Sequence, residues 1–497
     1  MDIPSCAWLI AIPISASVLV YLSGYLIKGR SAGSINQWLA LIALLATWVA
    51  FGITASQVGR DGPIALAVGD ISLQCDGVSL LLAAITLGLG TLVVLYSGAC
   101  LSNETGQEKY YAMIVAMIGV IMGLGCANDL FNLWIWFEAM AVCSYLLVVF
   151  YRDQPMSLEA GLKYLAQGAT GSVFILLAIG LVISQSGTVQ LQDLRASLDA
   201  SAIVLAAGVL FVIGFGVKAA LVPLHTWLPD AHSQAPSGIS AMLSGVVIEA
   251  GLIAMLRALS ALPVSGNSWS VLLLGFGALN MLVGNLMALR QTQVKRLLAY
   301  SSLTHMGYML VGVGIAIYAG VANAAQGGFF HLFNHGLMKG LAFLAAGTLL
   351  YTMVIQFGGH EPLTINDLAG AARRYPLVAL ALSLALLGLG GLPPLAGFMS
   401  KWQIFEAGFE THDVVIEWLI IFAALNSVLS LAYYAPLVNV VYRKQPSRAI
   451  LGGSRVPIGM SLSLVMLAVS VLVIGVWPSV LNWLTMPAGS ALLAAFR

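Results

Sequence analysis

Charged residues are what this sequence has least of. Only 8% of its 497 residues are charged, 60% are hydrophobic, and the formal net charge is +1. Soluble proteins carry about 25% charged residues, so a surface made from this sequence cannot face water. The shortage excludes a cytosolic enzyme, a nucleic-acid-binding protein with a basic patch and a disordered scaffold. A mean hydropathy of +0.95 indicates a polytopic membrane protein instead.

Alternating polar and apolar residues, paired cysteines and a basic N-terminal segment are also missing. Runs such as residues 80–95 and 377–387 are uncharged and do not alternate, which excludes an outer-membrane barrel. The five cysteines form no CxxC pair and no His/Cys metal spacing, so we interpret them as packing residues. Only Asp2 precedes the first apolar run, without a basic region. We therefore expect a retained span there, not a cleaved signal peptide.

Short polar stretches divide the chain into fourteen apolar segments, and the length of each is close to the roughly 20 residues that a helical span needs. The predicted spans lie near residues 4–27, 35–58, 77–98, 110–127, 129–150, 159–185, 201–223, 234–260, 268–289, 297–319, 323–352, 376–397, 414–441 and 456–480. No soluble domain and no long linker interrupts them. The predicted fold class is an all-α polytopic membrane protein with about fourteen transmembrane helices.

Basic residues are distributed unevenly between the two sets of loops. Loops after odd-numbered spans hold thirteen: Lys28, Arg30, Lys109, Arg152, Arg290, Lys295, Arg296, Arg373, Arg374, Arg443, Lys444, Arg448 and Arg455. Loops or ends after even-numbered spans hold four: Arg60, Arg195, Arg257 and Arg497. Because cytoplasmic loops carry the excess of Lys and Arg, we predict cytoplasmic odd loops and both termini outside, in the inner (plasma) membrane.

Four lysines fall inside or at the edge of predicted spans: Lys163, Lys218, Lys339 and Lys401. An ionisable residue within a span is costly and is a functional hypothesis by default. Lys163 could snorkel to the interface or pair with Glu159, four residues before it. Lys218 lies some 17 residues into its span and has no polar neighbour in the local sequence. Function is therefore favoured most clearly at Lys218.

Acids and histidines also occur within the spans. Glu138 is near the middle of the fifth span, where it must be protonated or paired with a buried lysine. Glu249 and His305 lie within the eighth and tenth spans. We include all three among the candidate proton-carrying groups.

In the eleventh span, His331, His335 and Lys339 recur every four residues. They share one helix face, which favours a proton relay. Two histidines at that spacing could hold a metal, but no third ligand is evident nearby, so the metal site is the weaker interpretation. The flanking glycines would permit a broken or distorted helix.

Prolines interrupt the seventh and twelfth spans. Pro223 follows Lys218, and Pro393 and Pro394 precede Lys401. Interrupted helices in corresponding halves of a transporter mark its ion site, because freed backbone groups line a hydrated cavity. Each of two five-helix units, spans 4–8 and 9–13, would contain one break, and an odd number of helices makes consecutive units inverted.

The predicted organisation therefore has four parts. They are helices 1–3 in residues 1–105, the first repeat in 106–262, the second repeat in 263–445 and helix 14 in 446–497.

Several local sequences together carry a resemblance to a known family. They are the segments 129–138 (DLFNLWIWFE), 218–232, 235–237, 243–245, 295–302 (KRLLAYSS), 331–335 (HLFNH) and 392–398 (LPPLAGF). In combination they resemble the antiporter-like subunits of respiratory complex I, a family that includes the large subunits of multisubunit Na+/H+ antiporters and of membrane-bound hydrogenases. The resemblance covers residues 75–440 and is highly specific in combination.

The resemblance implies a fourteen-helix fold with inverted repeats and a central hydrophilic axis in the membrane plane. By position, Glu138 matches a span-5 glutamate that pairs with Lys218, and Lys401 matches the terminal ionisable residue of span 12. His331, His335 and Lys339 match the span-11 relay.

The sequence departs from the family pattern at two positions. Many relatives carry a lysine where this chain has Glu249, so either Glu249 shuttles protons itself or the path runs through water and His305. Gln293 stands where the pattern has an acid, which is the milder departure.

The resemblance implies proton movement coupled to electron transfer in partner subunits of a complex-I-like oxidoreductase. We expect no cofactor in this chain, because it has no haem ligand pattern, iron–sulfur cysteines or nucleotide-binding glycine loop. The chain also stops shortly after the last predicted span, which favours a middle-type subunit.

An alternative remains open. The chain could be a D-type subunit of a Na+/H+ antiporter, or the membrane subunit of an energy-converting hydrogenase. The run at residues 129–133, together with Lys401, leans that way, whereas residues 299–307 and the span-11 segment lean towards complex I. A structural subunit that has lost transport is a third, weaker reading. Expected partners are other membrane subunits, lipid, protons and possibly Na+, with no nucleic acid.

Overall fold

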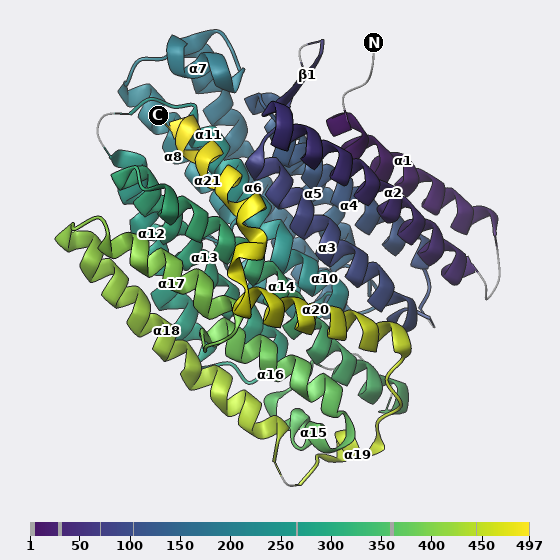
Figure 1. Ribbon diagram of the computed structural model, residues 1–497. Helices are drawn as coiled ribbons and strands as arrows, with labels where there is room; N and C mark the ends of the chain where they lie inside the picture. The colour runs from purple at the N-terminus through teal and green to yellow at the C-terminus, as the bar shows by residue number, and fades with distance from the viewer. Residues whose placement is uncertain are drawn as a thin grey trace.

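The computed structural model describes residues 5–27, 32–69, 71–102, 104–264, 267–357, 362–443 and 445–496. Asp2, and the basic residues Lys28, Arg30, Lys444 and Arg497 used to predict orientation, lie outside these ranges. The described chain is a bundle of helices with one small hairpin (Figure 1).

The first part of the bundle consists of long helices and the hairpin. Its elements are α1 (Ser5–Leu26), α2 (Ala32–Asp61), β1 (Ile64–Val68), β2 (Ile71–Cys75), α3 (Gly77–Cys100), α4 (Gln107–Cys126), α5 (Leu130–Val148) and α6 (Pro155–Ser186). The two strands pair antiparallel, with Ile64 opposite Cys75. No strand was predicted, because two five-residue strands are too short to stand out among apolar spans.

The second part contains the broken helices. Its elements are α7 (Leu191–Ser197), α8 (Ala202–Lys218), α9 (Trp227–Gln234), α10 (Ser237–Met242), the π-helix η1 (Leu243–Val247), α11 (Ile248–Ser260), α12 (Ser268–Ala288), α13 (Val294–Ala319), α14 (Ala322–Phe357), the 3₁₀-helix η2 (Ile365–Leu368), α15 (Ala371–Arg374), α16 (Pro376–Gly390), α17 (Ala396–Phe409), α18 (Val414–Val441), α19 (Arg448–Gly452), α20 (Ile458–Val476), the 3₁₀-helix η3 (Pro478–Leu481) and α21 (Asn482–Phe496).

Among the described residues, thirteen helices are long and apolar enough to cross a membrane. Two shorter apolar helices, α8 and α16, complete the set, and each is followed by a break and a second short helix. The all-helical, multi-span class and both predicted breaks are confirmed. The four-part division of the chain stays a prediction.

The eleventh span is not broken. The glycines around His335 permitted a break, but α14 is continuous over 36 residues. At Gly336, a Cβ atom would lie 2.7 Å from both the Gly245 carbonyl oxygen and the Ile85 side chain. The glycine therefore lets two helices approach closely instead of breaking the helix.

The C-terminal region differs from the single final span predicted near residues 456–480. That segment forms α20, but the chain bends at Trp477 and Pro478 and continues through η3 into α21. Proline fixes φ and lacks an N–H, so a helix ends readily before it. In Figure 1, α21 runs from this bend to the end of the bundle that carries α7.

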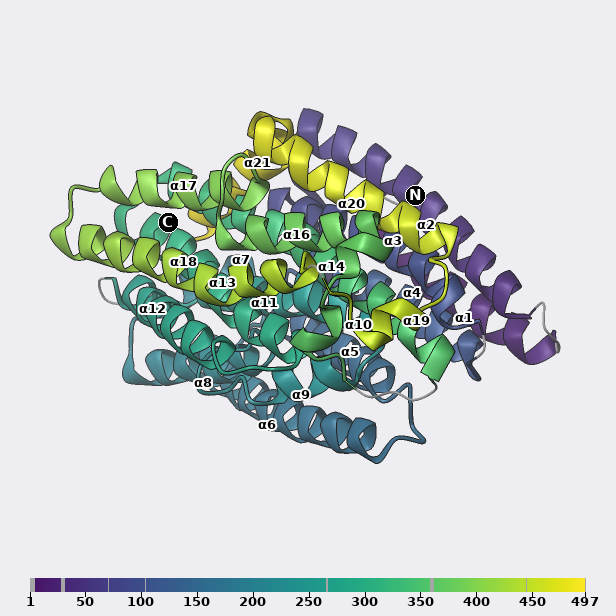
Figure 2. The ribbon, with the colours of Figure 1, turned by 90° about the horizontal axis from the view of Figure 1, so that it is seen from below.

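The two ends of the bundle carry different elements. The start of α1, β1, α7 and the end of α21 gather at one end, which we call the hairpin end, whereas α15 and α19 lie at the other, the α15 end (Figure 1). Viewed from below, α14 and α11 lie in the middle of the bundle, with α1, α6 and α18 at its periphery (Figure 2). Burial agrees, because α10, η1 and α11 are almost wholly enclosed, whereas α18 is largely exposed.

Candidate functional site: a buried polar axis

Seven of the eight predicted proton-carrying residues are almost wholly enclosed. The exposed fractions are 1% for Lys218, 0% for Glu249, 1% for His305, 0% for His331, His335 and Lys339, and 3% for Lys401. Glu138 is partly buried. Since ionisable groups are rarely this deep unless they are paired, the partners of each group decide what the site can do.

Five side chains from four helices form a connected series, which we call the histidine chain. Glu249 Oε1 lies 2.8 Å from His335 Nδ1. The rings of His335 and His305 are 5.1 Å apart between centroids. His305 Nδ1 then hydrogen-bonds to His331 Nε2 at 3.0 Å, and His331 Nδ1 to Ser400 Oγ at 2.9 Å. An imidazole can take a proton at one nitrogen and release one from the other, so each hydrogen-bonded part of the series can pass a proton. The two parts meet where the His335 and His305 rings are in contact, and His335 Nε2 has no hydrogen-bond partner there in the part of the chain that the structure describes.

Helix periodicity explains part of this arrangement. His331 and His335 are one turn apart on α14, so they lie on one face as predicted, and α13, α11 and α17 supply the other members. Lys339 continues that face but bonds elsewhere. Its Nζ donates to the Leu298 carbonyl oxygen at 2.6 Å and to Ser301 Oγ. Lys339 therefore extends the axis towards the first turns of α13.

Lys218 is enclosed by aromatic rings, which we call the aromatic cage. Its Nζ lies 4.2 Å from the ring centre of Tyr164, 4.7 Å from that of Tyr145 and 5.9 Å from that of Trp227. It donates one hydrogen bond, to Ser144 Oγ at 3.2 Å. A cation over aromatic faces gains up to about 2 kcal/mol when it is desolvated. The cage thus stabilises the ammonium group through ring faces of other helices and loops, since the residues next to Lys218 in sequence offer no polar partner.

Glu138 and Lys218 are within electrostatic range of each other but not in direct contact, so their expected pairing stays a prediction. Within the described part of the chain, no ion pair joins them, and Glu138 Oε1 is buried without a hydrogen-bond partner. Both Glu138 and Ser144 belong to α5, and six residues of helix separate them by about 9 Å along the axis. The residue of α5 that reaches the ammonium group is Ser144.

Lys401 contacts the backbone that the second break sets free. Its Nζ donates to the Leu389 carbonyl oxygen and to Ser427 Oγ, both at 2.9 Å, and lies 4.7 Å from the ring centre of Tyr308. Pro393 and Pro394 lie between α16 and α17, as Pro223 lies between α8 and α9. A carbonyl that has lost its helical partner inside a membrane needs another donor, and Lys401 provides it.

Several polar residues of the axis were not identified from the sequence. Serines such as Ser144, Ser301 and Ser400 are ordinary in apolar helices, so no sequence signal marks them. Lys295 was assigned to a loop, but it is 7% exposed at the start of α13 and donates to the Ala235 carbonyl oxygen at 2.8 Å. Lys295 lies two residues before the predicted start of the span at residue 297, and helix boundaries are uncertain by that much.

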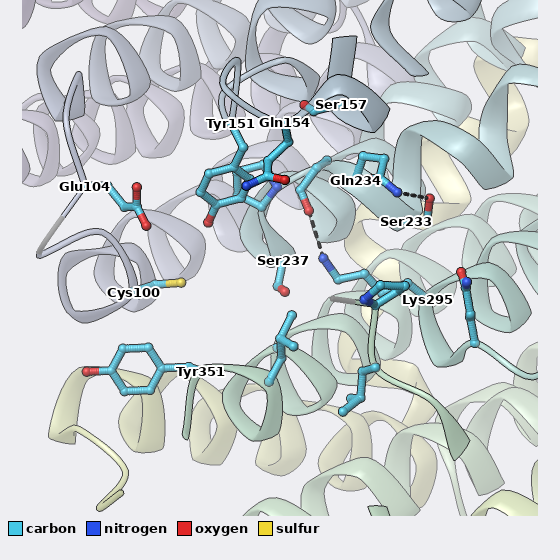
Figure 3. Close-up of a pocket in the computed structure, with 17 residues that line it drawn as sticks. Cys100, Glu104, Tyr151, Gln154, Ser157, Ser233, Gln234, Ser237, Lys295 and Tyr351 are labelled. Atoms are coloured by element: carbon cyan, nitrogen blue, oxygen red, sulfur yellow. Dashed lines mark hydrogen bonds between the residues drawn. The ribbon is translucent and has the colours of Figure 1, made fainter. Parts of the chain in front are cut away.

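A small cavity of about 70 Å³ adjoins Lys295. Figure 3 shows Ser237, Tyr151, Cys100 and Tyr351 around it, with the Lys295 ammonium pointing to its bonded carbonyl. Gln293 and Leu363, near the loops of the α15 end, also line it. The cavity gives the axis a polar approach from that end.

A metal centre finds no support in the described part of the chain, where no three His, Cys, Asp or Glu side chains are placed to hold an ion. The two histidines at the spacing considered for a metal, His331 and His335, bond instead to Ser400, His305 and Glu249. Three of their four ring nitrogens are thus directed at hydrogen-bond partners, whereas His335 Nε2 has none among the described residues.

The transmembrane-family model described as "NADH:quinone oxidoreductase/Mrp antiporter" matches residues 127–430. Across 97% of both chains, the sequence is 30% identical to F(420)H(2) dehydrogenase subunit N of Methanosarcina mazei. It is 32% identical to NADH-quinone oxidoreductase subunit N of Desulfitobacterium hafniense, over 78% of this chain and 79% of the relative.

Solved structures share the architecture. A chain of the archaeal membrane-bound sulfane sulfur reductase superposes with a TM-score of 0.86 at 28% identity, covering 99% of both chains. A chain of respiratory complex I from Thermus thermophilus superposes with a TM-score of 0.76 at 26% identity, covering 97% of this chain and 100% of that one. A chain of the Mrp complex from Dietzia has the same fold, with a TM-score of 0.85 at 21% identity over 99% of both.

Proposed function

The chain belongs to the NADH:quinone oxidoreductase/Mrp antiporter transmembrane family, and from that membership we propose that it is a proton-translocating membrane subunit of a complex-I-like respiratory oxidoreductase. The relatives named subunit N of F(420)H(2) dehydrogenase and of NADH-quinone oxidoreductase support this assignment. Electron transfer then belongs to partner subunits, and this chain carries no redox cofactor.

The observation that carries the proposal is the histidine chain. Its hydrogen bonds of 2.8 to 3.0 Å link Glu249 to His335 and His305 to Ser400 through His331. A purely structural bundle has no need of such groups, because buried polar groups can usually be replaced by well-packed apolar ones at little cost. Groups of this kind within spans mark proton relays.

Lys218 and Lys401 fit the two outer positions of the same path. Each lies beside a helix break, where freed backbone can line a hydrated passage. Burial disfavours the ammonium form of a lysine, whereas the aromatic cage and the carbonyl of Leu389 favour it. A small movement of either partner would therefore shift the proton, and such movements are what a coupled redox reaction in partner subunits would supply.

Membrane orientation follows the distribution of basic residues. Arg373, Arg374, Arg443 and Arg448 belong to or adjoin α15 and α19, so we place the α15 end in the cytoplasm. The hairpin end, with both termini, then faces outside in the inner (plasma) membrane. The cavity beside Lys295 would be the cytoplasmic approach to the axis.

The test uses the complete complex in proteoliposomes with the redox substrates of its co-purifying subunits. Lys218→Ala should reduce electron-driven proton uptake to background, while the assembled complex still reduces its electron acceptor. Lys163→Ala is the matched control, because Lys163 is a half-exposed lysine of α6 and should leave uptake unchanged. Uptake that survives Lys218→Ala would contradict the proposal.

The same preparation separates the alternative function. A D-type antiporter subunit would move protons against an imposed Na+ gradient without any electron donor. A hydrogenase subunit would require hydrogen-producing partners. Uptake that depends on the donor and acceptor but not on Na+ would support the oxidoreductase.

A further inference from the structure

A second cavity, of about 420 Å³, opens at the hairpin end. Its polar lining comes from β2, α7 and the residue before α3. The residues are Gln74 of β2, Gln192 and Arg195 of α7, and Asp76. Alanine and leucine residues of α21 form one wall. We call this space the hairpin-end cavity. It lies on the opposite end of the bundle from the cavity beside Lys295.

The hairpin-end cavity reaches deep into the bundle. Its lining includes Ile253 of α11 and Phe329 of α14, each only 1% exposed. Ile253 is one helical turn after Glu249, about 6 Å along the axis, and Phe329 is two residues before His331. The inner wall therefore stands within one turn of the Glu249 and His335 pair.

One carboxyl oxygen of Glu249 has no hydrogen-bond partner in the described part of the chain. Its Oε1 is bonded to His335, whereas Oε2 has no hydrogen-bond partner among the described residues. A carboxylate oxygen left unpaired in an apolar interior is costly. The group is therefore stabilised when Oε2 carries a proton or meets water.

Hydrogen bonds fix the positions of the elements around the mouth of the cavity. Arg257, near the end of α11, donates to Asp76 Oδ1 at 3.0 Å and to the Gly125 carbonyl oxygen at 2.6 Å. Arg195 donates to the carbonyl oxygens of Ala495 and Phe496 at 2.7 and 2.6 Å. The first set joins α11 to α3 and α4, and the second secures the end of α21 as a wall.

We propose that the hairpin-end cavity is a proton outlet for Glu249, so that the axis opens to the outer face at its middle. The inference rests on the proposed function. When the inner wall opens and water from the cavity reaches Oε2, the protonated carboxyl gives its proton to that water, forming hydronium, and the carboxylate then takes the next proton from the His335 imidazolium. Ile253 and Phe329 form the apolar barrier between the carboxyl and the cavity.

Cysteine accessibility tests the outlet in the full complex in proteoliposomes. Leu256→Cys and Ile253→Cys place thiols on the wall, and Leu252→Cys is the matched control, since Leu252 is equally buried on α11 but does not line the cavity. The probe is a membrane-impermeant, negatively charged methanethiosulfonate added at the hairpin end. Mass spectrometry of each labelled peptide separates the new thiol from the five native cysteines.

We expect Leu256→Cys and Ile253→Cys to react at least ~10-fold faster than Leu252→Cys, equivalent to ~1.4 kcal/mol of opening free energy. Modified Ile253→Cys should lose electron-driven proton uptake. Arg195→Ala, which releases α21, should speed the labelling of Ile253→Cys further.

Equal reaction rates at the three positions would show that water does not reach the cavity wall from the hairpin end. Full proton uptake after modification of Ile253→Cys would show that the cavity is not the proton outlet. If the complex without substitutions takes up no protons during electron transfer, the proposed function fails and the outlet fails with it. The labelling rates still report the cavity in that case, so the two failures are distinguishable.

Discussion

Each helix break has a buried lysine beside it, but the two ammonium groups are stabilised by different chemistry. Lys218 is the last residue of α8, before the first break, whereas Lys401 is in α17, after the second. Three aromatic rings and one hydroxyl surround Lys218, whereas Lys401 has a freed carbonyl, a hydroxyl and one ring. A buried ammonium group can thus be stabilised by ring faces or by the backbone of the break itself.

The backbone of the two breaks differs as well. The first turns at Ala220, with φ of 54°, and the second at Gly391, with φ of 81°. In the first break, Asn280 of α12 accepts from the Val222 amide at 2.9 Å and donates to the Ala220 carbonyl oxygen at 3.2 Å. In the second, a Cβ on Gly391 would lie 3.2 Å from Lys401 Nζ. The glycine brings the chain close to the lysine, whereas the first break is held by a neighbouring helix.

Lys401→Met should have the largest effect. It removes the charge but keeps an unbranched side chain, so we expect electron-driven proton uptake to fall to background, as for Lys218→Ala. Proton uptake by proteoliposomes is the measurement, and Lys163→Met is the control at an exposed site. Retained uptake would show that only the first of the two lysines carries protons.

Asn280→Leu should destabilise the first break and leave the second unaffected. The substitution leaves the Val222 amide and the Ala220 carbonyl without a partner inside the membrane, at a cost of about 3 kcal/mol. The midpoint of thermal unfolding of the detergent-purified complex reports this cost. Leu279→Ala, an exposed change on the same helix, should shift the midpoint far less. Equal shifts would mean that Asn280 does not hold the break.

Tyr164→Leu should weaken the aromatic cage without removing Lys218. Loss of a ring at 4.2 Å from the ammonium removes about 1 to 2 kcal/mol, so the rate of proton uptake should fall about 5- to 30-fold. Tyr164→Phe keeps the ring and loses only the hydroxyl contact to Ser144. Should both variants pump equally slowly, the hydroxyl and not the ring face would be the important group.

The smallest effects are expected from exchanging the turn residues. Ala220→Gly removes a left-handed strain of about 1 to 2 kcal/mol and adds chain entropy of about 0.5 to 1 kcal/mol, so stability should rise slightly. Gly391→Ala should lower stability by about 1 to 2 kcal/mol and slow proton uptake, because the added methyl group crowds Lys401. Opposite shifts in the unfolding midpoint would support the comparison. A loss of stability in Ala220→Gly would show that the first turn is not strained.

Residue identity was enough to find the deep groups but not their partners. The rarity of charge made Lys218, Glu249, Lys339 and Lys401 visible at once, because each stands alone in an apolar run. The serines that bond to them are common in such runs, so nothing in the sequence distinguished Ser144 or Ser400. At Lys218 likewise, the sequence offered Glu138 as a partner of opposite charge but did not show that Ser144 makes the direct hydrogen bond.

The sequence by itself determined the membrane class, the approximate spans and the positions of the two breaks, because hydropathy and proline act on residues that are near in the chain. Only the tertiary structure decided that Glu249 bonds to His335, 86 residues away, that Lys218 lies in an aromatic cage and that α14 stays continuous. It also decided that two cavities approach the axis from opposite ends. Such contacts depend on how separate helices pack, and each helix alone is compatible with many arrangements.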